Sequence, residues 1–245
     1  MDHAEYLIAL RRDAPALLDA VRAADPDTTI AACPAWKPLD LAWHIGEVHR
    51  FWATVAGERR RVPPEPWPPE RPASDEAVLA YADDSVRIML EVLSEADPAT
   101  RVWTWSDEHQ DVAFILRRMA QETAVHRVDA ERAAGRSEHE VEASLAADGI
   151  DEYLFRFLPW TARAAEPLGG SVHVHCTDTE GEWTVTPRND GPDDVTTGHA
   201  KGDAALRGRA HHLLMALWRR DGTEHLDVFG DTSLAQRFLA RTNNE

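Results

Sequence analysis

The spacing of apolar residues changes partway along the chain, and this change limits the possible folds more than any other feature. Up to about residue 135, apolar side chains recur every three or four positions in four segments, which is the period of an amphipathic helix. After about residue 140, short segments alternate apolar and polar residues, as half-buried strands do. The sequence therefore predicts an α+β fold with a helical domain at residues 1–140 and a smaller α+β domain at residues 141–245.

The first domain is predicted to be an antiparallel four-helix bundle. Its helices are expected at residues 3–23, 39–57, 75–95 and 112–134. Asp2 with Glu5 resembles a capping box, and Ser74 and Asp111 stand where N-caps are expected. Pro15 is expected to kink the first helix, and the proline-rich stretch 61–73 must be a loop. Helices joined by short links favour antiparallel packing.

The second domain is predicted to mix helices with a small sheet. Segments 171–176 and 182–186 alternate strictly around the turn residues 178–181, which indicates a β-hairpin. The remaining elements are expected to be helices at 146–164, 209–220 and 232–241, a third strand near 193–207 and a short strand at 225–229.

The charge balance narrows the possible partners. The chain has 26 Lys and Arg against 43 Asp and Glu, a net charge of −17. Such a surface does not suit nucleic acid or an anionic membrane, since both require basic residues. No apolar run approaches the ~18–20 residues of a membrane span, and Met1–Glu5 lacks a signal-peptide pattern. We therefore expect a cytoplasmic protein that is a monomer or a small homo-oligomer and takes small molecules as its partners.

Three polar residues interrupt the apolar faces of two predicted helices. His44 lies within the apolar face of segment 39–57, and Glu122 and His126 lie four residues apart on the inward face of segment 112–134. No inward Arg or Lys is expected to pair with Glu122. Two imidazoles and one carboxylate suit Zn²⁺ and leave one position open for catalysis. Asp129 is predicted to orient the His126 ring.

Simpler interpretations of these histidines stay open. An inward histidine is often only a hydrogen-bonded core residue, and a Glu–His pair at this spacing is often only an ion pair. His173 and His175 share one strand face with Ser171 and Thr177, which favours a solvated strand surface over a metal site.

Several segments resemble the mycothiol-dependent maleylpyruvate isomerase family. In the first domain the similar segments are Cys33–Trp36, Asp40–Gly46 and Glu122–Glu131. In the second domain they are Arg207–Gly208, Leu213–Arg220 and Val228–Asp231. The resemblance implies a DinB-like metal-binding N-terminal domain and a sterol-carrier-like C-terminal domain.

The resemblance also implies a function. It assigns the metal ligands to His44, Glu122 and His126, with Zn²⁺ as the metal and mycothiol or a similar thiol as co-substrate. A metal-bound thiol would attack an electrophilic small molecule, in an isomerase or in an S-transferase. The family also uses an arginine in its second domain, for which Arg219, Arg220 and Arg207 are the candidates. The Arg-rich, Lys-poor composition suits a GC-rich actinobacterium.

Two alternatives from other classes remain. A non-enzymatic protein that binds lipids or other small apolar molecules would use the second domain, and any zinc in it would be structural. A zinc hydrolase would use metal-bound water as its nucleophile, with Asp129 as a possible general base.

Overall fold

The computed structural model describes residues 1–162, 166–188 and 191–242. Its internal contacts divide the chain into two compact units, Met1–His139 and Glu140–Glu245. No helix in the described ranges is both long enough and apolar enough to cross a membrane.

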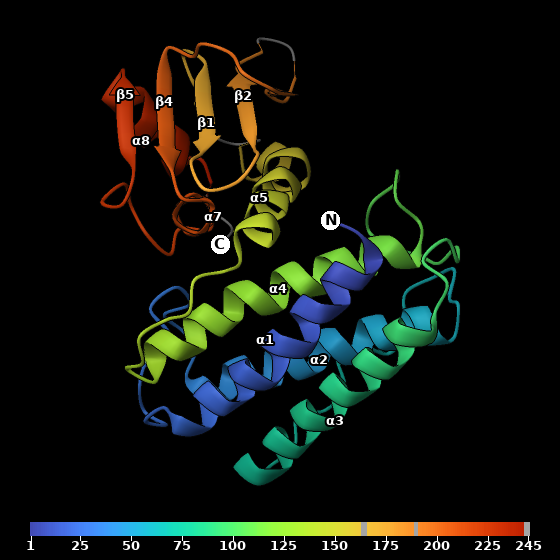
Figure 1. The fold of residues 1–245 in the computed structure, drawn as a ribbon. Helices are drawn as coiled ribbons and strands as arrows, with labels where there is room; N and C mark the ends of the chain where they lie inside the picture. Colours follow the sequence, from blue (N-terminus) through green and yellow to red (C-terminus); the bar gives the residue numbers. More distant parts are fainter. Residues whose placement is uncertain (163–165, 189–190, 243–245) are drawn as a thin grey trace. The chain divides into compact units, whose positions relative to one another are not determined.

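The first unit consists of four packed helices (Figure 1). They are α1 (His3–Ala23), α2 (Pro38–Gly57), α3 (Asp75–Glu95) and α4 (Val112–Ala133), and all four predicted helices are confirmed. The starts of α1, α3 and α4 could be predicted from their N-caps. The side chains of Asp2, Ser74 and Asp111 each accept a backbone N–H of the following turn. Pro15 lies inside α1, which continues past it as one helix.

The bundle is not antiparallel throughout. Gly46 of α2 lies against Tyr81 and Ala82 of α3, and Gly57, further along α2, lies against Val92, further along α3. The two helices therefore run parallel, and α1 and α4 likewise run in the same direction (Figure 1). The physical reason is the link at 58–74, which is long enough to return along the bundle before α3 begins.

The second unit begins with a helical segment. It comprises α5 (Ala143–Glu152), a single π-helical turn η1 (Tyr153–Phe157) and α6 (Leu158–Thr161). This segment agrees with the helix predicted over 146–164 as far as residue 161, and residues 163 and 164 lie outside the described residues. Helices α7 (Ala210–Leu217) and α8 (Thr232–Ala240) complete the helical part of this unit.

The same unit contains a mixed sheet of five strands in the order β3-β2-β1-β4-β5. The strands are β1 (Val172–Cys176), β2 (Glu182–Thr186), β3 (Asp194–Thr197), β4 (Ala204–Gly208) and β5 (Asp227–Gly230). The β1–β2 hairpin is confirmed, and β1 pairs in parallel with β4 while the other pairs are antiparallel. The single strand predicted near 193–207 is wrong, because the turn between Gly198 and Gly202 divides it into β3 and β4.

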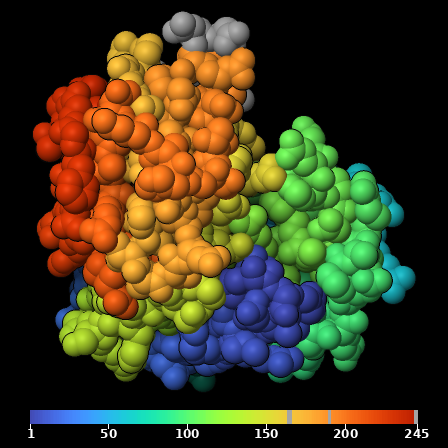
Figure 2. Space-filling model, turned by 45° about the horizontal axis from the view of Figure 1, so that its top comes forward, coloured from blue at the N-terminus to red at the C-terminus, as the bar shows by residue number. Residues whose placement is uncertain are grey.

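The two faces of the sheet differ in chemistry. Val172, Val174 and Cys176 of β1 are buried, together with Val185 of β2. Because side chains alternate along a strand, His173 and His175 belong to the other face. Figure 2 shows gold and orange residues, the colours of these strands, at the surface of the unit.

Candidate metal centre

His44 is held near the start of α2 by local capping. Pro38 is the first residue of the helix, and the Asp40 carboxylate accepts the Lys37 backbone N–H at 2.9 Å. The His44 side chain is 27% exposed, and its ring centroid lies 4.8 Å from that of Trp36. The imidazole is thus packed against an aromatic ring while part of it stays open to solvent.

Glu122 and His126 of α4 face this histidine. One oxygen, Oε1 of Glu122, lies 2.9 Å from His44 Nε2 and 3.3 Å from His126 Nε2. All three donor atoms lie within 4.8 Å of one another. The structure therefore brings together the three residues that the sequence singled out, on two facing helices.

Two further residues of α4 hold the triad in place. Asp129 Oδ2 lies 2.9 Å from His126 Nδ1, so that ring presents Nε2 to Glu122. Arg118 Nη2 donates to Glu122 Oε2 at 2.8 Å, which leaves Oε1 for the histidines. The expectation that no basic residue pairs with Glu122 is therefore wrong. Arg118 precedes Glu122 by four residues, and this spacing was the available signal.

The contacts within the triad shift the pKa values of its members. Burial opposes ionisation of Glu122, but hydrogen bonds with His126 and His44, together with the charge of Arg118, hold its pKa well below the usual range. Burial likewise opposes protonation of His126, but its contacts with Asp129 and Glu122 raise its pKa to about 9. Without metal, the site therefore holds a carboxylate beside an imidazolium.

His49 does not join the triad. It is fully buried in α2, and its Nε2 lies 2.9 Å from the Thr123 hydroxyl. Burial lowers its pKa to about 4, so the ring is neutral. His49 is a core residue, and neither it nor Asp129 belongs to the group of three converging ligands in this unit.

A cavity of about 380 Å³ opens beside His44. Its other lining residues are mostly apolar or aromatic: Val48, Phe51, Trp52, Trp67 and Pro68, with Glu47 as the one additional acid. A largely apolar wall with few polar groups is typical of a small-molecule site. The sequence analysis did not predict that the proline-rich loop would contribute Trp67 and Pro68 to this wall.

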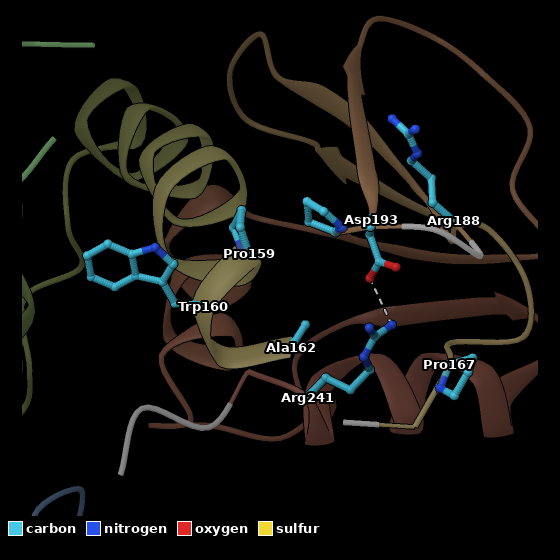
Figure 3. Close-up of a pocket in the computed structure, with 9 residues that line it drawn as sticks. Pro159, Trp160, Ala162, Pro167, Arg188, Asp193 and Arg241 are labelled. Atoms are coloured by element: carbon cyan, nitrogen blue, oxygen red, sulfur yellow. Dashed lines mark ion pairs between the residues drawn. The ribbon is translucent and has the colours of Figure 1, made fainter. Parts of the chain in front are cut away.

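The arginines predicted for the second domain occupy separate places. Arg207 lies on β4, 3.4 Å from Asp227, and Arg219 and Arg220 follow α7, where they donate to the carbonyls of Ala240 and Trp218. None of the three lines the cavity of about 450 Å³ that the described residues of this unit enclose (Figure 3). Arg188 and Arg241 line it instead, and Arg241 is paired with Asp193 at 2.8 Å.

The triad fits a zinc ion by the size and chemistry of its donor set. Ligands bound tetrahedrally at 2.0–2.1 Å lie about 3.4 Å apart, close to the 2.9 and 3.3 Å seen here. Imidazole nitrogen and carboxylate oxygen are ligands that Zn²⁺ accepts, and three protein ligands leave a fourth position open. His44, Glu122 and His126 would hold the ion, with Asp129 and Arg118 behind them.

The fold and the triad together define a class: a helical bundle with a His–Glu–His group that could hold a metal ion, followed by a small α+β unit. Comparison with known families makes the assignment specific. The profile of the mycothiol maleylpyruvate isomerase N-terminal domain matches residues 7–131, and that of the corresponding C-terminal domain matches residues 144–237. The chain belongs to the mycothiol maleylpyruvate isomerase family.

Solved structures agree with this assignment at the level of the fold. The chain superposes on a crystal structure of the mycothiol-dependent maleylpyruvate isomerase with a TM-score of 0.65, 13% sequence identity and 93% of each chain covered. A histidine-to-alanine mutant of that enzyme gives a TM-score of 0.63 at 12% identity, again with 93% of each chain covered. No curated protein matches the sequence significantly.

Proposed function

We propose that this chain is a zinc-dependent enzyme that uses mycothiol or a similar low-molecular-weight thiol to attack an electrophilic small molecule. One observation carries the proposal. The Nε2 atoms of His44 and His126, from two facing helices, both lie close to Glu122 Oε1, next to a cavity. Membership of the mycothiol maleylpyruvate isomerase family supports the same chemistry.

Zinc bound at the triad would lower the pKa of a coordinated thiol and supply it as a thiolate. The protein residues prepare the site for that event. Arg118 holds Glu122 in one orientation and keeps it ionised, and Asp129 keeps a proton on Nδ1 of His126 so that Nε2 is the ligating atom. His44 and Glu122 remain 27% and 20% exposed, which gives a thiol access.

The cavity beside His44 would receive the electrophile. Phe51, Trp52 and Trp67 line it and would exclude water from the reacting carbon. In an isomerisation, the thiolate adds to one carbon of a conjugated double bond, the resulting single bond rotates, and elimination restores the double bond and the thiolate. In an S-transferase the adduct is protonated and leaves as a thioether.

The experiment compares the wild-type chain with His44→Ala. We expect the wild type to bind about one zinc per chain at this site and the variant to bind none there. Calorimetric titration should show mycothiol binding only to the zinc-loaded wild type. Turnover of maleylpyruvate would then require both zinc and thiol. Zinc-dependent turnover without thiol would favour a hydrolase, and a wild type that binds neither zinc at the triad nor thiol would refute the proposal.

A further inference from the structure

The polar face of the C-terminal sheet carries a second group of potential metal ligands. His173 and His175 lie on β1, Glu182 begins β2, and His199 follows β3. We refer to these four residues as the sheet cluster. They lie wholly within the second unit and share no residue with the triad of the helical bundle.

Strand register explains why these residues meet. His175 is the direct cross-strand partner of Glu182, and His173 lies two residues earlier on the same face of β1. His199 arrives from the far side of β2, because Gly198 turns the chain with a φ of 102° and donates its N–H to the Glu182 carbonyl at 2.9 Å. A positive φ of this kind favours glycine.

The spacing of the donor atoms matches a coordination sphere. Glu182 Oε2 lies 3.1 Å from His173 Nε2, 3.5 Å from His175 Nδ1 and 2.8 Å from His199 Nδ1. All four donor atoms lie within 4.8 Å of one another. Tetrahedral ligands at zinc bond lengths stand about 3.4 Å apart, so little movement would be needed to admit an ion.

The burial of His173 is a second, independent observation that points to a ligand. Its side chain is only 8% exposed, and its Nε2 makes no hydrogen bond within the described residues although it points at the cluster. Glu182 Oε2 is near this nitrogen, but a buried polar atom that makes no hydrogen bond costs about 1–3 kcal/mol. The expectation of a solvated strand surface is therefore wrong for His173, and a metal ion would satisfy this nitrogen.

We propose that His173, His175, Glu182 and His199 form a second divalent-metal site, for which zinc is the best-fitting ion. Four protein ligands close a tetrahedral sphere, which is typical of structural rather than catalytic zinc. The ion would tie the chain after β3 to the central strand β1 and so stabilise the sheet edge. This proposal does not rest on the proposed function.

The competing interpretation is a metal-free hydrogen-bond network in which Glu182 accepts from the surrounding histidines. The experiment therefore counts metal in a background without the first site. Full-length His44→Ala/His126→Ala protein, stripped of metal, is titrated with Zn²⁺ and dialysed before its metal content is measured. We expect one zinc per chain, and a rise in the melting temperature on loading.

The matched variant adds His175→Ala and His199→Ala to that background. Both side chains are at least 31% exposed, so the fold should survive their loss. We expect the bound zinc and the thermal shift to disappear, whereas His225→Ala, a surface histidine in the same unit, should leave both unchanged. A background protein that binds no zinc, or zinc binding that is unaffected by the two cluster substitutions, would overturn the proposal. Four-coordinate absorption bands on Co²⁺ substitution, lost with the cluster, would support it.

Discussion

Arg118 and Glu122 form an ion pair of 2.8 Å, one turn apart on α4, and this pair decides which carboxylate oxygen faces the histidines. The Arg118 side chain is only 5% exposed, so little water competes for Oε2. Oε1 is left to His44 and His126. A basic residue beside a candidate metal ligand thus orients the ligand without occupying the atom that would bind the ion.

The first prediction concerns that ion pair. Arg118→Met removes a positive charge that helps to keep Glu122 ionised. The pKa of the buried Glu122 carboxyl should therefore rise. We expect zinc affinity to fall by about 10–100-fold, as is usual when an outer partner of a ligand is lost. The zinc affinity of Arg118→Lys, which keeps the charge, should lie between those of Arg118→Met and the wild type. Competition with a chromophoric chelator measures the affinities, and equal values for all three proteins would contradict this role.

The second prediction concerns Asp129. Asp129→Asn keeps an oxygen near His126 Nδ1 but removes the negative charge that supports the imidazole as a ligand. We expect zinc to bind about 10–100-fold more weakly, with the fold intact. Asp107→Asn, an exposed loop substitution in the same unit, is the control and should leave the affinity unchanged.

The third prediction concerns proton release. A pKa of about 9 means that His126 is protonated at pH 7 in the metal-free protein, whereas a ligating imidazole must be neutral at Nε2. Zinc binding at pH 7 should therefore release about one proton from this residue. Apparent affinity should rise with pH up to about 9 and then level off. Calorimetry of the chain with the sheet cluster disabled, in buffers of different ionisation enthalpy, measures the release; zero protons would refute the assignment.

Most of the helical unit could be predicted from local signals in the sequence. The helix predicted at 75–95 coincides with α3, because Ser74 caps its start and the apolar spacing runs without interruption. His44, Glu122 and His126 were predictable because a polar residue inside an apolar helical face is itself informative. Helix direction was not predictable in the same way, since the link at 58–74 is compatible with either a tight return or a crossover.

In the second unit, the pairing of strands that are far apart in the sequence could not be predicted. The parallel pairing of β1 with β4 joins residues 172–176 to 204–208, and no local pattern encodes such a partner. The sequence analysis did not predict the sheet cluster for the same reason. His173 and His175 were visible in the sequence, but Glu182 and His199 join them only through strand register and the turn at Gly198.

The fourth prediction tests the contact between the parallel helices. A Cβ added at Gly46 would lie 2.9 Å from Tyr81 Cδ1 and 3.2 Å from Ala82 Cα, which is too close for normal packing. We expect Gly46→Ala to destabilise the first unit by about 1–3 kcal/mol despite its higher helix propensity. Gly57→Ala, whose nearest neighbour would be a Val92 methyl at 3.4 Å, is the control and should cost less. Denaturant unfolding measures both, and a stabilised Gly46→Ala protein would show that α2 and α3 are not packed this closely.

The last prediction concerns stability at acid pH. Burial lowers the pKa of His49 to about 4 from a usual value of 6.5, so between these values the unfolded chain binds a proton that the folded chain does not. The contribution of His49 to the free energy of unfolding therefore falls as pH falls through this window, and is constant above it. From pH 7 to pH 5 the loss should be about 2 kcal/mol. His126, whose pKa of about 9 lies above the usual 6.5, makes a smaller opposite contribution of about 1 kcal/mol over this range, and this contribution is common to the two proteins compared below. His49→Gln, which can still donate to Thr123, should be less sensitive to pH by this amount in urea unfolding of the metal-free chain. An identical pH dependence in the two proteins would mean that His49 becomes protonated without unfolding of the bundle.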